Sequence, residues 1–443
     1  MKCKIIAIAA ALALGCGLFS GCNNSSAGEK EKEKVEIILK VPTLLMTSVC
    51  DPDVAQAYDF LSKAAEDFEE NYTDYDVEIN IRKFELTNET AAITGSYDTG
   101  NAADVLYEGY FNMATYIHGG RVVPLDDIIT DETRGDIDQS YWDMSSVNGK
   151  TYMMPYLSLQ NILLYNKELF RSAGLEEFIS DENVIQSWAA DEWDHILDTL
   201  AEKLPENHFP MMMYAKNDQG DTHIMTLIRS RGSGFFDSSG NFKISSDEGK
   251  AALKWIAEGN KKGWFPPYCE DLEITDMVEL FTNGQLAILM ANNASIPDNY
   301  GIDAGYVNFP SLDGKGFATS FVTGFEVFDN GDDTKIKVAK DFIKYIYEHE
   351  QWLDYEAGGI PANGTVSRKY KDQVFMLEQF YENSANVVDF TANAPNWRGV
   401  RDVFYTHIRN LLMGKSPDDV AREIDEECNA AISSGREQSV LHE

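Results

Sequence analysis

The fold of this chain can be predicted from one stretch, Val147-Asn-Gly-Lys-Thr-Tyr-Met-Met-Pro-Tyr-Leu-Ser-Leu-Gln-Asn-Ile-Leu-Leu-Tyr-Asn-Lys-Glu-Leu-Phe170. Asn148-Gly149 predicts a type I′ hairpin turn, because both residues tolerate the positive φ angles that this turn requires. A strand is expected to return from the turn toward Pro155. Residues 162–165 form a short apolar run typical of a buried strand, and the helical spacing after it, with Gly174 placed to cap a C-terminus, predicts a helix.

The order of the motifs around this stretch resembles one protein family. Asn148-Gly-Lys-x-Tyr-x-x-Pro-Tyr156 is followed by Leu163-Leu-Tyr-Asn-Lys-x-Leu-Phe170 and by Ala173-Gly-Leu175. This order is similar to that of the carbohydrate-type extracellular solute-binding proteins of ABC importers, the group that contains the maltodextrin-binding proteins. The resemblance implies an α/β fold of the two-lobe periplasmic-binding-protein type. Each lobe would be a mixed, mainly parallel sheet flanked by helices, with hinge strands between the lobes.

The N-terminal residues predict an export signal and a tether. A basic start precedes the apolar run at residues 5–14, which is too short to span a bilayer but has the length of a signal h-region. Leu18-Phe-Ser-Gly-Cys22 resembles a bacterial lipobox, which implies removal of residues 1–21 and lipidation of Cys22; Ala13-Leu-Gly-Cys16 is a poorer candidate. An ordinary secretory signal with a chance cysteine is the alternative. Residues 22–34 are polar and then alternate Glu and Lys, which predicts a flexible tether.

The composition narrows the class of partner. The chain carries 37 basic and 73 acidic residues, a net charge of −36, which disfavours nucleic acid and anionic lipid as partners. Three cysteines, Cys50, Cys269 and Cys428, follow the predicted cleavage site, so at least one of them is expected to be unpaired. No C-x-x-C motif or Cys/His cluster is present, and we expect neither a metal nor a cofactor. The predicted location is extracytoplasmic, with the lipid anchor as the only membrane attachment.

The rest of the chain is long enough for two cores, since about 410 residues follow the tether. Alternating apolar residues predict strands at 35–41 and 77–81, helical spacing at 54–68 predicts a helix between them, and residues 103–107 predict a third strand. This order is typical of a parallel sheet with helical crossovers. Combined with the resemblance, it predicts one lobe made of residues 35–157 plus 322–350 and a second made of 158–321 plus 351–443.

Candidate ligand-binding residues follow the ends of the predicted strands. Glu108, Tyr110 and Phe111 come directly after the third strand, and ligands of open α/β sheets bind beyond the C-terminal ends of the strands. The alternative is that these aromatic residues only plug the edge of the sheet. The resemblance implies a cleft floor that includes Tyr156, Ser158 and Gln160, and two site residues after a buried strand, Asn292 and Asn293. It also implies a glycine-containing loop, Thr323-Gly324-Phe325, and an aromatic platform at Trp397 with Arg401 nearby. One further candidate, His223, lies in a divergent region.

Motifs for catalysis are absent from the sequence. None of the phosphate-binding, dinucleotide-binding, nucleophile-elbow or zinc-protease patterns occurs, and acidic pairs such as Asp126/Asp127 are expected by chance among 73 acidic residues. The chain is therefore predicted not to be an enzyme. The resemblance implies instead a monomeric, lipid-anchored component of an ABC importer. It would capture a sugar or oligosaccharide between its lobes and deliver it to the permease. The alternatives are a surface glycoside hydrolase, which needs two carboxylates facing each other across a cleft, and the sugar-sensing subunit of a signalling receptor.

Overall fold

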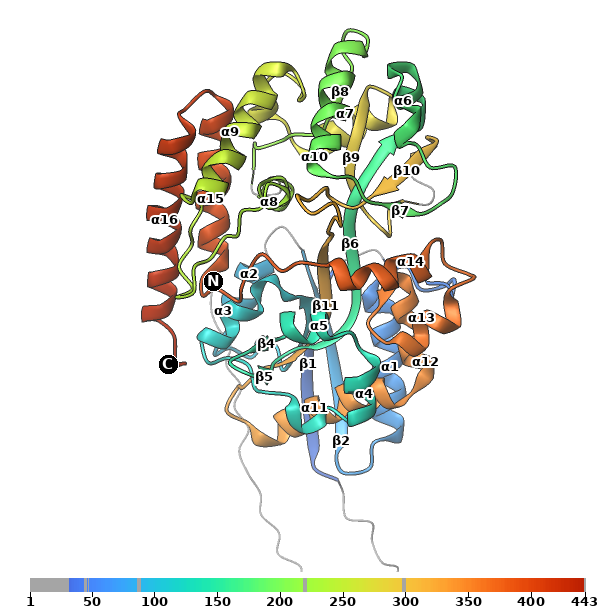
Figure 1. The fold of residues 1–443 in the computed structure, drawn as a ribbon. Coiled ribbons are helices and arrows are strands. Elements are labelled where there is room, and N and C mark those ends of the chain that lie inside the picture. The colour runs from blue at the N-terminus through green and yellow to red at the C-terminus, as the bar shows by residue number, and fades with distance from the viewer. Residues whose placement is uncertain are drawn as a thin grey trace, which may run out of the picture.

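The computed structural model of the protein describes residues 32–43, 46, 48–85, 89–217, 221–296 and 300–441. The predicted signal peptide, the predicted lipidation site Cys22 and most of the predicted tether lie outside these residues. Figure 1 shows two lobes, one above the other, with the long strand β6 (Met154–Asn166) running through both. Within the described ranges, no helix is long and apolar enough to cross a membrane.

The first lobe begins with the strand, helix and strand that the apolar spacing predicts. β1 (Lys34–Pro42) pairs in parallel with β2 (Asp76–Phe84) and β3 (Val105–Gly109), and α1 (Ala57–Asn71) forms the crossover from β1 to β2. The predicted hairpin is also confirmed, because β4 (Ser146–Val147) and β5 (Lys150–Thr151) pair antiparallel, and Asn148 and Gly149 have φ angles of 51° and 73°. The other helices of this lobe are α2 (Glu89–Thr94), α3 (Met113–His118), α4 (Asp131–Asp136), α5 (Gln139–Met144), α11 (Asp333–Glu348), α12 (Glu350–Leu353), α13 (Gly364–Tyr370) and α14 (Leu377–Glu382).

One ten-stranded sheet continues through both lobes, and its main path runs β2-β1-β3-β11-β6-β10-β7. β11 (Thr319–Val327) pairs antiparallel with both β3 and β6, so it ties the first lobe to the long strand. The register of β11 against β6 shifts between Thr323 and Gly324. Such an irregularity bends the bulged strand locally, and here it lies within the first lobe, where Gly324 pairs with Glu108 of β3.

The second lobe is built around the far half of β6. That half pairs antiparallel with β9 (Leu286–Asn292) and β10 (Ala304–Val307), while β8 (Phe209–Met211) and β7 (Ile185–Gln186) add parallel pairs at the edges. The sheet of this lobe is therefore mixed rather than mainly parallel, because β6 enters from the other lobe and is paired antiparallel on both sides. The helices of this lobe are α6 (Lys167–Ala173), α7 (Ala190–Lys203), α8 (Asp221–Ser230), α9 (Asp247–Lys262), α10 (Ile274–Thr282), α15 (Trp397–Leu412) and α16 (Pro417–Glu437).

The hydrophobic cores correct one predicted boundary between the lobes. The first core includes Trp352, Tyr355 and Ala362, although the prediction ends the first lobe at residue 350. A small apolar cluster around Val366 and Tyr370 packs against Leu353 and extends the same lobe further. The physical reason is that α12 follows α11 after a one-residue break, so the chain continues on the first lobe, as Figure 1 shows.

Candidate ligand-binding site between the lobes

Two of the predicted site residues, Glu108 at the end of β3 and Tyr110 directly after it, are buried. Glu108 is completely buried within the strand, opposite Gly324 of β11, so its carboxylate does not line an open surface. Tyr110 is buried as well, and its hydroxyl donates to Asp389 Oδ1 at 3.0 Å, which links the lobe to a distant segment of the chain. Burial and the Asp389 carboxylate raise the pKa of Tyr110 well above its ordinary value.

Phe111 is the residue of this group that lies between the lobes. Its half-buried ring packs against both the first and the second hydrophobic core, and its centroid is 5.0 Å from that of Phe321 on β11. The turn Tyr110–Asn112 also lies against α15 of the second lobe. Phe111 and Phe321 therefore form an apolar contact at the point where the lobes meet.

The predicted cleft floor along β6 is covered by other parts of the protein. Tyr156 belongs to the first core, where its ring stacks on Phe60 at 5.4 Å and its hydroxyl donates to the Trp352 carbonyl. The hydroxyl of Ser158 hydrogen-bonds to that of Ser320 on β11, and both side chains are buried. This corrects the expectation that Tyr156 and Ser158 face the ligand, because the neighbouring strand and helices already occupy their surroundings.

The Gln160 side chain is likewise engaged within the protein. Its Nε2 donates to the Phe380 carbonyl at 2.9 Å and to Ser384 Oγ at 3.0 Å, and its Oε1 accepts from Asn383 Nδ2 at 3.2 Å. Ser384 Oγ lies 2.8 Å from the Tyr141 hydroxyl of the first lobe. The buried network thus joins the long strand, the first lobe and the segment after α14, and Gln160 is structural here.

Residues 383–396, which we call the crossing segment, form a third connection between the lobes. Figure 1 shows the chain leaving α14 and running between the lobes to the start of α15. The segment hydrogen-bonds to Ala318, the residue before β11, and Asn393 Nδ2 donates to the Ser146 carbonyl of the first lobe at 2.9 Å. Sequence reasoning missed its role, although the cluster Thr391-Ala-Asn-Ala-Pro-Asn396 is a loop signal directly before Trp397.

The asparagines predicted after the buried strand do lie at its end. Asn292 and Asn293 are half-buried, and Asn293 Oδ1 accepts from the Gln160 backbone N–H at 3.0 Å. Asn292 Oδ1 accepts from the Ser295 N–H at 3.2 Å and so shapes the turn that follows. The end of this strand is therefore held next to Gln160, through the Gln160 backbone rather than its side chain.

The predicted hinge-side residues of β11 pack inward. Thr323 is buried, and Phe325 lies in the first core, with its ring centroid 4.9 Å from that of Tyr107. A Cβ atom added to Gly324 would lie 2.1 Å from the Met154 carbonyl oxygen. Gly324 therefore permits a close approach of two backbones at the bulge, and Phe325 is a core residue rather than a ligand contact.

The two predicted site residues on α15 differ in burial. Trp397 is 2% exposed and lies in the second core, with its ring centroid 6.3 Å from that of Phe236. It is buried because it shares the buried face of α15 with Val400 and Phe404. This corrects its assignment as an aromatic platform. Arg401, one turn further along α15, is half-buried.

The structure also places His223, another predicted site residue, in a core. It is fully buried on α8, its Nε2 is 3.0 Å from the Met212 carbonyl oxygen, and its ring stacks on Tyr214 at 5.8 Å. Burial lowers the pKa of His223 to about 4, as expected for an imidazole held neutral in an apolar core.

A pocket of about 540 Å³ opens elsewhere between the lobes, beside residues 392–395 of the crossing segment. No predicted site residue lines it, and the C-terminal residues close part of it, since Ser439 Oγ lies 2.9 Å from His118 Nδ1 of the first lobe. In the part of the chain that the structure describes, no group of three or more His, Cys, Asp or Glu could hold a metal ion. Cys50, Cys269 and Cys428 have free thiols.

The chain was compared with known proteins. The family model described as "Bacterial extracellular solute-binding protein" matches residues 51–351. The diacetylchitobiose binding protein DasA of Streptomyces coelicolor is 23% identical over 394 residues, which cover 85% of this chain and 87% of that protein. Two similar solved structures are the sugar-binding protein MalE of Xanthomonas citri (TM-score 0.72, 14% identity, 91% and 98% of the chains) and the cyclic alpha-maltosyl-1,6-maltose binding protein of Arthrobacter globiformis (TM-score 0.70, 17% identity, 90% and 100%).

Proposed function

Because the chain belongs to the bacterial extracellular solute-binding protein family, we propose that it captures a sugar or oligosaccharide between its lobes for an ABC importer. The relative DasA is named for binding diacetylchitobiose, and the similar structures are those of sugar-binding proteins. The observation that carries the proposal is the interlobe face on which Phe111 of the first lobe contacts the second core. A ligand held there would touch both lobes.

The chemistry of that face suits a carbohydrate. The Phe111 and Phe321 rings offer apolar surface to the C–H face of a sugar, while amide and guanidinium groups can bind its hydroxyls. We assign this second role to Asn292, Asn293 and Arg401, which are half-buried rather than core residues. The site we propose is therefore smaller than the set expected from the sequence.

Binding would act through the relative position of the lobes. β6, β11 and the crossing segment join the lobes, so bending of these three connections would change the position of one lobe relative to the other. A ligand that contacts both lobes favours the conformation in which those contacts are made, and it shifts the population toward it. The closed form would then be the one that the permease recognises.

Attachment to the cell surface is part of the proposal. The lipobox-like Leu18-Phe-Ser-Gly-Cys22 and the polar tether after it support lipidation at Cys22, which would hold the binding protein near its permease. Mass spectrometry of the mature N-terminus should find a diacylglyceryl-modified Cys22. An unmodified N-terminus produced by cleavage at another position would contradict the anchor and leave the sugar site unaffected.

A thermal-shift screen across mono- and oligosaccharides tests the binding function. A ligand that binds only the folded state stabilises it by about 2.7 kcal/mol at a hundredfold excess over Kd, which a melting curve detects readily. For a sugar found in this way, Phe111→Ala should weaken binding about tenfold, the equivalent of about 1.4 kcal/mol, whereas Tyr268→Ala should not, since Tyr268 is 75% exposed. If no sugar shifts the melting temperature, or both variants bind like the wild type, the proposed ligand class or site is wrong.

A further inference from the structure

A groove on the second lobe carries basic side chains on an otherwise acidic protein. It lies between α9 and the turn that joins α15 to α16, and its volume is about 700 Å³. Its lining includes four lysines, five apolar side chains and two acidic residues: Lys250, Lys254, Lys261, Lys415, Ala251, Ala257, Leu411, Leu412, Met413, Glu258 and Asp418. None of these residues belongs to the interlobe site, and the chain as a whole has a net charge of −36.

Three of the lysines form a stripe along α9. Lys250, Lys254 and Lys261 are separated by four and then seven residues, so they share one side of the helix. At 1.5 Å of rise per residue, the stripe is about 16 Å long. An extended peptide rises about 3.3 Å per residue, so about five residues would match this length.

The positive charge of the stripe is only weakly compensated. Lys250 Nζ is 3.9 Å from Asp418 Oδ1, and Lys254 Nζ is 3.7 Å from Glu258 Oε1, which are long contacts between exposed groups and contribute little. Lys261 makes no ion pair with any residue that the structure describes. These lysines thus remain available to another anion.

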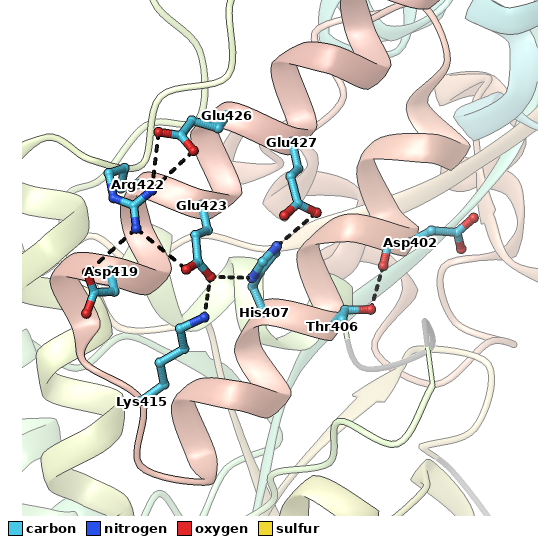
Figure 2. A network of polar contacts seen from close by, with 9 residues as sticks. All are labelled: Asp402, Thr406, His407, Lys415, Asp419, Arg422, Glu423, Glu426 and Glu427. Carbon is cyan, nitrogen blue, oxygen red and sulfur yellow. Dashed lines mark hydrogen bonds and ion pairs between the residues drawn. The ribbon is translucent and has the colours of Figure 1, made fainter.

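Lys415, on the opposite wall, differs from the stripe. Figure 2 shows its ammonium group held by Glu423, which also faces Arg422 and His407. The turn is thereby fixed against α16, and beside Lys415 the Met413 side chain is 66% exposed. One wall of the groove is therefore fixed by ion pairs and partly apolar, while the other carries the weakly compensated charge of the α9 lysines.

We propose that this groove binds an acidic, extended segment of a partner protein, with one apolar side chain of that segment against Met413. A short segment senses mainly the local charge, because screening limits electrostatic interactions to about 10 Å at 0.1 M salt. A long polyanion such as nucleic acid would also meet the negative field of the rest of the protein. The groove is thus matched to a short acidic peptide.

The test uses a fluorescein-labelled hexapeptide of glutamates with one central leucine, measured by fluorescence anisotropy with the full-length protein. Lys254→Glu/Lys261→Glu should weaken binding at least tenfold. The matched control is Lys203→Glu/Lys344→Glu, which should stay within twofold of the wild type. Lys344 pairs with Glu348 at i,i+4 as Lys254 does with Glu258, and Lys203 lies in the last turn of α7 as Lys261 does in α9.

Three results would overturn the proposal. They are the absence of peptide binding by the wild type, equal losses in the two double variants, and binding of an oligothymidylate of the same charge as tightly as the peptide. The four substituted lysines, Lys203, Lys254, Lys261 and Lys344, are exposed, so melting curves should show that both double variants remain folded. Loss of peptide binding without any change in sugar affinity would separate this surface from the interlobe site.

Discussion

Replacing Trp397 by alanine separates a core role from a ligand-binding role at the start of α15. The indole is 2% exposed and packs with the second core near Phe236. A buried aromatic side chain removes about 150–250 Å² from water, which at about 25 cal/mol per Å² corresponds to about 4–6 kcal/mol. Measured Trp→Ala changes in cores cost about 3–5 kcal/mol, so we expect a loss of that size in the free energy of unfolding.

Urea unfolding followed by far-UV circular dichroism measures this loss. Trp397→Phe keeps an aromatic ring and should lose much less stability, and Tyr268→Ala, at a residue 75% exposed, should change it by less than about 0.5 kcal/mol. The sugar affinity of folded Trp397→Ala protein should stay within threefold of the wild type. An unchanged unfolding free energy with tenfold weaker sugar binding would refute the core assignment and restore Trp397 as an aromatic platform.

Three further predictions concern Gly324 at the bulge of β11, a buried carboxyl group and the C-terminus. Gly324→Ala should destabilise the protein by about 1–3 kcal/mol in urea unfolding, because its Cβ would lie 2.1 Å from the Met154 carbonyl oxygen. Burial raises the pKa of the Glu356 carboxyl group well above its ordinary 4.5. Its contribution to stability is therefore greatest below about pH 4.5 and declines as the pH rises toward the folded-state pKa, so the melting temperature should fall over that range. Glu356→Gln should make the melting temperature depend less on pH. Deleting residues 438–443 removes the Ser439 contact with His118, and small-angle scattering should show a wider distribution of interlobe distances.

Controls distinguish these effects from general damage. Gly135→Ala should leave stability unchanged or higher, because nothing lies within 4 Å of the added Cβ. Replacing an exposed acid, Glu348→Gln, should leave the pH profile unaltered. If the truncated protein scatters like the full chain, the C-terminal contact does not restrain the lobes.

Much of the architecture could be predicted because it depends on local patterns. Alternating apolar residues identify β1 and β2, Asn148-Gly149 specifies a turn that few other dipeptides allow, and the spacing around Phe170 indicates a helix after β6. The family and its two lobes came instead from the resemblance carried by the ordered motifs from Asn148 to Leu175.

The site could be predicted only in part, because strand ends do not reveal what lies opposite them. Asn292 and Asn293 do lie at a strand end, and Phe111 does lie between the lobes. Trp397 was predicted as an aromatic platform and His223 as a site residue in a divergent region, yet both side chains are buried by helix packing. An aromatic residue at the start of a helix has the same local signal whether it stacks on a sugar or on other side chains.

In the sequence by itself, local periodicity predicted strands, helices and the hairpin, because each depends on neighbours within about ten residues, and the resemblance to a known family implied the two-lobe fold. Tertiary structure alone decided which polar groups are free for a ligand. Tyr110 is bound by Asp389, 279 residues away, and Gln160 by Ser384, 224 residues away. Whether such a side chain faces a ligand or a partner within the chain depends on contacts between segments remote in sequence, and no local periodicity records them.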